Sequence, residues 1–144
     1  MKIAVVGSRD YPDLEKVRRL VDLLPHDAHV VSGGARGVDS AAEARAVGRG
    51  LCVSSYRVQQ THWEPDRFEV QLHTWEDGSY GGYVLLEDDF ETFAEAALWR
   101  NGEIVSDAED GVVAFWDGVS RGTGDTVARA QSAGRRVTIV RPYE

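Results

Sequence analysis

The stretch VVSGGARGVDSAA at residues 30–42 passes from a β-branched run into glycines and then into alanines. Val30 and Val31 favour a strand, the glycines at 33, 34 and 37 favour a tight turn, and the alanines favour a helix. Such a turn directs backbone N–H groups outward, and the helix that follows adds the positive end of its dipole. The stretch therefore predicts an anion site to which Arg36 adds positive charge. A strand-to-helix turn without a ligand stays open as the alternative.

Two other loops have the same form, with small residues and an arginine directly after an apolar strand. The first follows the strand expected at residues 2–6 and reads GSRD at residues 7–10. The second follows the strand expected at residues 111–115 and reads WDGVSRGTG at residues 116–124. Because the loops after parallel strands emerge at one edge of a sheet, all three are expected to form one site.

Strands and helices alternate along most of the chain. Between Leu14 and Leu24 the apolar residues recur every three or four positions, which predicts a helix with one buried face. Further helices are expected at residues 41–47, 90–107 and 125–133, and further strands at 30–32, 51–55 and 136–140. This alternation predicts an α/β three-layer fold with a mainly parallel five-stranded sheet. The strand order 3-2-1-4-5 gives right-handed connections that do not cross.

The segment at residues 57–89 interrupts this alternation. Apolar and polar residues alternate from Phe68 to His73, and Asp77-Gly78 is typical of a two-residue hairpin turn, so an inserted β-hairpin is expected. The insertion belongs to an acidic region, residues 57–110, that holds 14 acidic residues against three arginines. A lid, a dimer contact and a solvated excursion are all open as its role.

Composition and charge exclude several classes of protein. The 144 residues carry a net charge of −8, and no part of the sequence has the basic stripe that an extended nucleic acid needs. The N-terminal apolar run is too short for a signal peptide or a membrane span, so one cytoplasmic domain over residues 1–144 is expected. The one cysteine, Cys52, excludes an internal disulfide, and His62 and His73 lack the spacing of metal ligands. Neither a metal nor a cofactor is expected.

Four motifs together resemble the YspA-type branch of the SLOG superfamily. They are GSR at residues 7–9, SGGARGVD at 32–39, RNxE at 100–103 and AFWDGxSRGT at 114–123. The resemblance covers most of the chain outside residues 57–89, and it implies a Rossmann-like sheet with a pocket for a nucleotide or a nucleotide derivative. The superfamily includes cytokinin-activating phosphoribohydrolases, DNA-processing DprA proteins and proposed sensors of nucleotide signals.

By this resemblance, residues of all four motifs would line the ligand pocket. They are Gly7, Ser8, Arg9, Ser32, Gly33, Gly34, Ala35, Arg36, Gly37, Asp39, Arg100, Asn101, Glu103, Asp117, Ser120, Arg121, Gly122 and Thr123. The phosphoribohydrolase pattern PGGxGTxxE ends in a catalytic glutamate, but Thr126 stands at that place here. The candidates for a catalytic carboxylate are therefore Asp39, Glu103, Asp117 and Asp125.

Three functions follow from these features, and the sequence favours the first. Binding of a nucleotide, as a sensor or a sequestering protein, needs only the anion loops, the arginines and an aromatic face, for which Tyr11, Trp63 and Trp116 are candidates. Hydrolysis of a nucleotide N-glycosidic bond also needs a catalytic carboxylate. DprA-like binding of single-stranded DNA needs basic grooves, which the acidic middle region disfavours. Four tryptophans and the hairpin also predict a homodimer.

Overall fold

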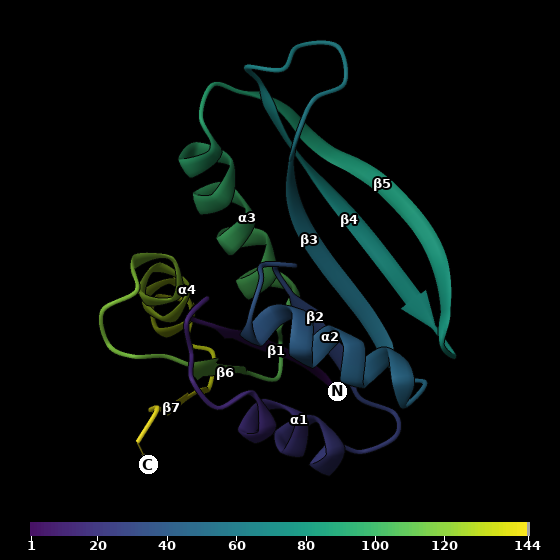
Figure 1. The fold of residues 1–144 in the computed structure, drawn as a ribbon, viewed down its shortest axis with the longest axis vertical. Helices are drawn as coiled ribbons and strands as arrows, with labels where there is room; N and C mark the ends of the chain where they lie inside the picture. Colours follow the sequence, from purple (N-terminus) through teal and green to yellow (C-terminus); the bar gives the residue numbers. More distant parts are fainter. Residues whose placement is uncertain (144) are drawn as a thin grey trace.

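A computed structural model describes residues 1–143 of the protein as four helices and seven strands in a single sheet (Figure 1). In chain order they are β1 (Lys2–Gly7), α1 (Leu14–Leu23), β2 (His29–Ser32), α2 (Val38–Gly48), β3 (Cys52–Gln60), β4 (Phe68–Glu76), β5 (Ser79–Phe90), α3 (Phe93–Asp107), β6 (Val112–Phe115), α4 (Arg121–Ser132) and β7 (Val137–Val140). The strand order is β5-β4-β3-β2-β1-β6-β7. No helix among these residues is both long and apolar enough to cross a membrane.

The five strands β3, β2, β1, β6 and β7 are parallel and confirm the predicted order. β1 lies at the centre, where it pairs with β2 on one side and with β6 on the other. Its side chains are buried on both faces, as a central parallel strand requires: Val5 belongs to one core cluster and Ala4 and Val6 belong to the other.

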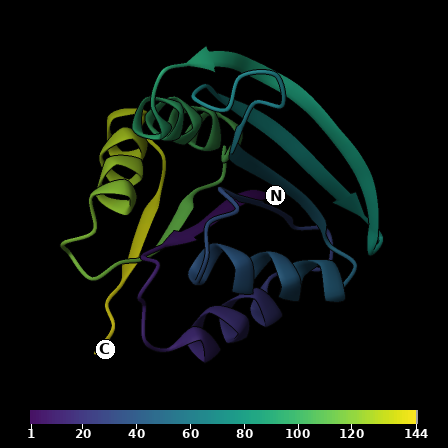
Figure 2. The same ribbon diagram turned by 45° about the horizontal axis from the view of Figure 1, so that its top comes forward.

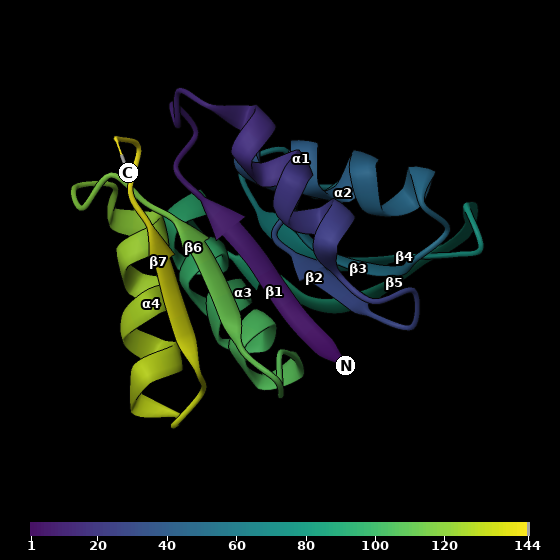
Figure 3. The same cartoon turned by 90° about the horizontal axis from the view of Figure 1, so that it is seen from below.

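Two layers of helices cover the sheet, with α1 and α2 on one face and α3 and α4 on the other (Figure 3). Helix α1 begins where the Asp13 side chain accepts hydrogen bonds from the backbone N–H groups of Glu15 and Lys16. It buries Val17 and Val21 against the sheet, as its spacing predicts. The three-layer α/β fold predicted from the alternation is therefore confirmed.

The hairpin is part of the sheet rather than an excursion from it. β3 continues to Gln60, beyond the predicted end at residue 55, and β4 pairs with it antiparallel over eight residue pairs. β5 then forms the outer edge of a seven-stranded mixed sheet, in place of the predicted five strands and a separate insertion at 57–89. Figure 2 shows β4 and β5 as a long curved ribbon that arches from α3 toward the far end of α2. The predicted turn holds, since Asp77 and Gly78 both have positive φ, at 52° and 79°.

Candidate functional site

A pocket of about 740 Å³ opens at the carboxyl ends of β1, β2 and β6. The three glycine-containing loops that follow these strands contribute to it, together with one side of α3. Its lining comprises Val6, Gly7, Ser8, Arg9, Asp10, Gly33, Ala35, Asp39, Phe93, Ala94, Ala97, Leu98, Arg100, Asn101, Ile104, Asp117, Val119, Ser120, Arg121, Gly122, Thr123 and Thr126. Parallel strand order brings these distant parts of the chain to one place.

The wall of this pocket that α3 supplies is mainly apolar. Phe93, Ala94, Ala97, Leu98 and Ile104 follow one another at helical spacing along it. Phe93 and Leu98 are 43% and 44% exposed, which is high for large apolar side chains on a helix that packs against a sheet. A flat apolar group can therefore contact this wall without displacing the core.

The loop after β6 presents the start of α4 to the same pocket. Asp117 accepts hydrogen bonds from the backbone N–H groups of Val119 and Ser120, both at 2.8 Å, and these bonds lower the pKa of its carboxyl. Ser120, at the helix N-cap, makes no capping hydrogen bond with its side chain. The first-turn residues Arg121 to Thr123 line the pocket, so the positive end of the helix dipole faces it.

Ser8, in the loop after β1, adds a buried hydroxyl to this end of the pocket. Its residue is only 2% exposed. Although the hydroxyl contributes to the lowered pKa of Asp117, it reaches no hydrogen-bond partner at bonding distance and angle among residues 1–143. A buried hydroxyl in this state can serve a ligand oxygen.

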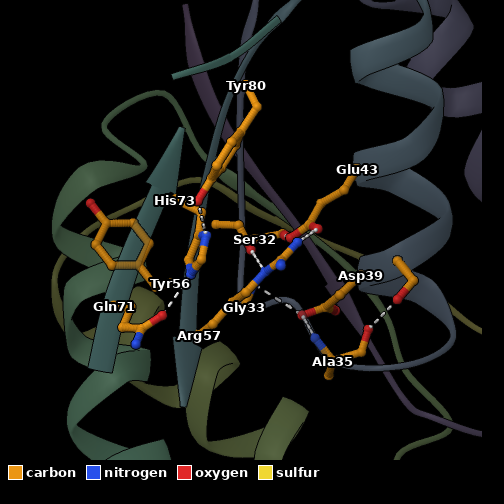
Figure 4. A network of polar contacts seen from close by, with 12 residues as sticks. Ser32, Gly33, Ala35, Asp39, Glu43, Tyr56, Arg57, Gln71, His73 and Tyr80 are labelled. Atoms are coloured by element: carbon orange, nitrogen blue, oxygen red, sulfur yellow. Dashed lines mark hydrogen bonds and ion pairs between the residues drawn. The ribbon is translucent and has the colours of Figure 1, made fainter. Parts of the chain in front are cut away.

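The loop after β2 is already occupied by a carboxylate of the chain itself (Figure 4). Asp39 Oδ2 accepts hydrogen bonds from the backbone N–H groups of Gly33 at 3.0 Å and Ala35 at 3.4 Å. Burial raises the pKa of Asp39 to about 6, against the opposing effect of the Arg100 guanidinium. The external anion predicted for residues 32–37 is thus replaced, at these two amides, by the side chain of Asp39.

Arg100 joins α3 to this loop. Its Nη1 donates to the backbone carbonyl oxygens of Gly33, at 2.7 Å, and Tyr56, at 3.2 Å. Burial lowers the pKa of Arg100, and the charge of Asp39 opposes that shift. Two of the predicted motifs, SGGARGVD and RNxE, therefore meet through this side chain.

A second pocket of about 350 Å³ lies beside the first. It is lined by Arg9, Gly33, Gly34, Ala35, Arg36, Arg57, Val58, Gln59, Phe93 and Arg100. Half of these residues also line the larger pocket, namely Arg9, Gly33, Ala35, Phe93 and Arg100. The two pockets are therefore neighbouring parts of one depression at the sheet edge.

Comparison with known proteins identifies the family. Residues 1–142 match the family described as DNA recombination-mediator protein A. The chain belongs to this family. The structure of DNA processing protein A (DprA) from Streptococcus pneumoniae has a similar fold, with a TM-score of 0.69 at 22% sequence identity. The match covers 96% of this chain but 49% of that protein, so this chain spans about half its length. A comparison with curated proteins finds no match.

Most of the residues predicted to bind a ligand line the first pocket of this family member, including the candidate carboxylates Asp39 and Asp117. Gly34 and Arg36 line the second pocket instead. Ser32, Gly37, Glu103 and Asp125 line neither.

Three of these four residues have structural contacts that explain their positions. Ser32 Oγ bonds Glu43, and Asp125 Oδ2 accepts hydrogen bonds from Asn101 Nδ2 at 3.0 Å and Arg129 Nε at 2.8 Å. Gly37 has a φ of +86°, and a Cβ there would lie 2.5 Å from the carbonyl oxygen of Arg9. Gly37 is therefore needed for the close approach of two loops rather than for contact with a ligand.

The aromatic candidates Tyr11, Trp63 and Trp116 do not line either pocket. Tyr11 is buried and donates to the carbonyl oxygen of Arg141 at 3.0 Å, while Trp116 Nε1 donates to the carbonyl oxygen of Ser120 at 2.9 Å. Phe93 is the aromatic side chain in the pockets.

Sequence reasoning placed Arg100 and Asn101 of α3 in the pocket but missed the apolar residues of that wall and the contribution of β3. The spacing of the α3 apolar residues had a plain interpretation as core, and only the exposure of Phe93 and Leu98 distinguishes them. Arg57 was not among the predicted site residues because it is the first residue of the segment interpreted as an insertion. In the structure it lies on β3 and lines the smaller pocket. Among residues 1–143, no group of three or more His, Cys, Asp or Glu side chains is placed to hold a metal ion.

Proposed function

We propose that this chain binds a nucleotide or a nucleotide-derived small molecule in the larger pocket, as a sensor or a sequestering protein. The observation that carries the proposal is the division of the pocket into a polar side, where arginines and the N–H groups at the start of a helix lie beside carboxylates, and an apolar side. Arg9, Arg121 and the first turn of α4 lie among the loops, whereas α3 contributes the apolar wall. This combination suits a phosphate joined to a base.

The phosphate end is expected at α4. Helix N-termini bind anions through free N–H groups and through the dipole, and the Ser8 hydroxyl and the Arg121 guanidinium add further donors. The base is expected against α3, where Phe93 offers an aromatic surface. The order and spacing of the four motifs further support placing the chain in the YspA-type branch of the SLOG superfamily.

Calorimetric titration with adenosine 5′-monophosphate and guanosine 5′-monophosphate tests this proposal. Arg121→Gln removes a charged contact worth about 1.5 to 3 kcal/mol, so it should weaken binding about tenfold or more. Arg18→Gln removes the same charge from α1, where Arg18 pairs with Glu15 at 2.8 Å and lines neither pocket. It should leave the affinity unchanged. Failure of both nucleotides to bind at millimolar concentration would count against the proposal.

Nucleotide hydrolysis is a second candidate function because Asp39 combines a place in the pocket with a pKa of about 6. A carboxyl with that pKa can exchange a proton near neutral pH. The position of the phosphoribohydrolase glutamate, however, is taken by Thr126, which lines the pocket and whose hydroxyl donates to the carbonyl oxygen of Gly122 at 3.2 Å. We therefore expect binding without release of free base. Steady base release that Asp39→Asn abolishes would favour the hydrolase.

Binding of single-stranded DNA is favoured by the family alone, whose described members mediate DNA recombination. The acidic residues at 57–110 disfavour it, because a strand needs a continuous basic path. A competition experiment, in which an oligonucleotide and adenosine 5′-monophosphate are offered to the protein together, measures which of the two ligands the site prefers.

A further inference from the structure

The smaller pocket differs from the larger one in charge. Four arginines line it, Arg9, Arg36, Arg57 and Arg100, and no acidic residue does. The larger pocket includes the carboxylates of Asp10, Asp39 and Asp117. In a chain with a net charge of −8, a pocket lined by four cations and no anion is a strong attractor for a negative group.

Two of the four arginines keep their charge uncompensated. Arg57 pairs with Glu43 at 3.1 Å, and Arg100 is next to the carboxylate of Asp39. Arg9 and Arg36 are exposed and form no ion pair with residues 1–143. Their charges are therefore available to a ligand.

Arg57 is held in the pocket from three sides. Its Nη2 bonds Glu43 (Figure 4). Its Nε donates to Ser55 Oγ at 3.0 Å, and its guanidinium carbon lies 5.3 Å from the centre of the Trp75 ring on β4. The fourth side is Gly34, where a Cβ would lie 2.6 Å from Arg57 Cγ. The hairpin thus takes part in the site, because its first strand carries the ring that stacks on Arg57.

The two pockets share five lining residues, with Arg9, Arg100 and the Gly33–Ala35 turn at their boundary. We propose that the smaller pocket binds a second phosphate of the ligand in the larger pocket, so that the ligand is a nucleotide with two separate phosphate groups. This inference rests on the proposed nucleotide binding and adds the class of nucleotide. It also assigns a role to the hairpin, which keeps Arg57 in position for the second phosphate.

The test compares adenosine 5′-monophosphate with adenosine 3′,5′-bisphosphate by calorimetry. The bisphosphate should bind about tenfold or more tightly than the monophosphate, since a charge-assisted contact is added. Arg36→Gln should remove most of that advantage and leave the monophosphate affinity unchanged. Arg57→Gln should do the same, and Arg18→Gln, outside both pockets, should change neither affinity. Arg36 is exposed and unpaired, so its variant keeps the test valid where Arg57→Gln does not fold.

Two phosphates flanking one nucleoside also occur within a single DNA strand. If the bisphosphate binds more tightly than a 5′-phosphorylated deoxyadenosine dodecamer, the ligand is a free nucleotide, and the reverse order identifies a DNA strand. Either result supports a two-phosphate site, provided that Arg36→Gln weakens the binding of whichever ligand binds more tightly. Equal affinities for monophosphate and bisphosphate would overturn this inference and leave the proposed function intact. Binding of neither nucleotide nor the dodecamer would overturn both.

Discussion

Asp39 is the residue at which the loop after β2 departs most from its predicted role. The carboxylate is 5% exposed and accepts the two amide hydrogen bonds that an external anion was expected to accept. Three glycines and a nearby arginine are visible in the sequence, but the rotation of one aspartate side chain back into its own loop is not. The arginine that the sequence places in the anion site, Arg36, lines the smaller pocket together with Gly33, Gly34 and Ala35 of the same loop.

The raised pKa of Asp39 predicts a particular dependence of stability on pH. Burial raises that pKa from 3.8 to about 6, so folding favours the protonated carboxyl. The stability it contributes is complete below pH 3.8 and is lost as the pH rises through 6. Between pH 4.5 and 7.5, the free energy of unfolding should fall by about 2 kcal/mol relative to Asp39→Asn, measured by urea unfolding.

Asp117→Asn is the matched control for this measurement. The pKa of Asp117 is lowered by the N–H groups of Ser120 and Val119, so its contribution is present above its unfolded pKa and is lost in acid. Replacing Asp117 should therefore leave the decline between pH 4.5 and 7.5 in place. A decline that persists in Asp39→Asn would show that another group causes it.

Gly34 carries a second prediction at the residue scale. An alanine there would adopt a φ of +70° and bring its Cβ within 2.6 Å of Arg57 Cγ. Gly134 has a similar φ of +72° with nothing within 4 Å of a Cβ, so Gly134→Ala has the backbone strain alone, about 1 to 2 kcal/mol. Gly34→Ala should destabilise the protein more in urea unfolding, because Arg57 must leave its position. Equal losses would mean that Arg57 is not held by this contact.

Among the elements, the parallel half of the sheet could be predicted and the antiparallel half could not. Helices between parallel strands restrict the handedness of each connection, and the order predicted on that ground is the one that β3, β2, β1, β6 and β7 adopt. An alternating segment with an Asp77-Gly78 turn predicts a hairpin but does not specify which edge it joins. Here β4 joins β3, and this choice brings the Trp75 ring to Arg57, which lines the smaller pocket.

β5 is the element on which the predicted homodimer would depend. It is an edge strand of 12 residues, and Tyr83, Val84 and Leu85 along it are between 46% and 57% exposed. Long apolar edge strands pair readily with another chain, and two copies can do so antiparallel about a two-fold axis. We expect Val84→Lys to convert a dimer into a monomer in light scattering at micromolar concentration.

Leu23→Lys serves as the control for the dimer because Leu23 is 82% exposed and lies on α1, away from β5. This variant should remain dimeric, since it adds the same charge to a different surface. A parent protein that is monomeric at tens of micromolar concentration would show that β5 stays unpaired in solution.

The distribution of charge over the whole molecule argues for a small ligand. Residues 57–110 carry 14 acidic side chains and three arginines, and two of these arginines, Arg57 and Arg100, line the pockets. Positive charge is therefore concentrated at the carboxyl edge of the sheet while the rest of this region is acidic. A ligand with two phosphates meets this concentration, but a strand that continues past the site meets acidic surface.

This distribution predicts how binding responds to salt. A ligand that neutralises one or two arginines releases few counterions, so its affinity should fall by less than about tenfold between 50 and 200 mM salt. A strand that needs six or more phosphate contacts should lose about a hundredfold or more over the same range. Calorimetry with adenosine 3′,5′-bisphosphate and with the dodecamer at both salt concentrations measures the two responses.

Because Arg9 and Arg36 are the unpaired cations of the smaller pocket, replacing both with glutamine should make the affinity for the bisphosphate less dependent on salt, as it is for the monophosphate. A steep response to salt that survives this double replacement would place the binding surface outside the two pockets.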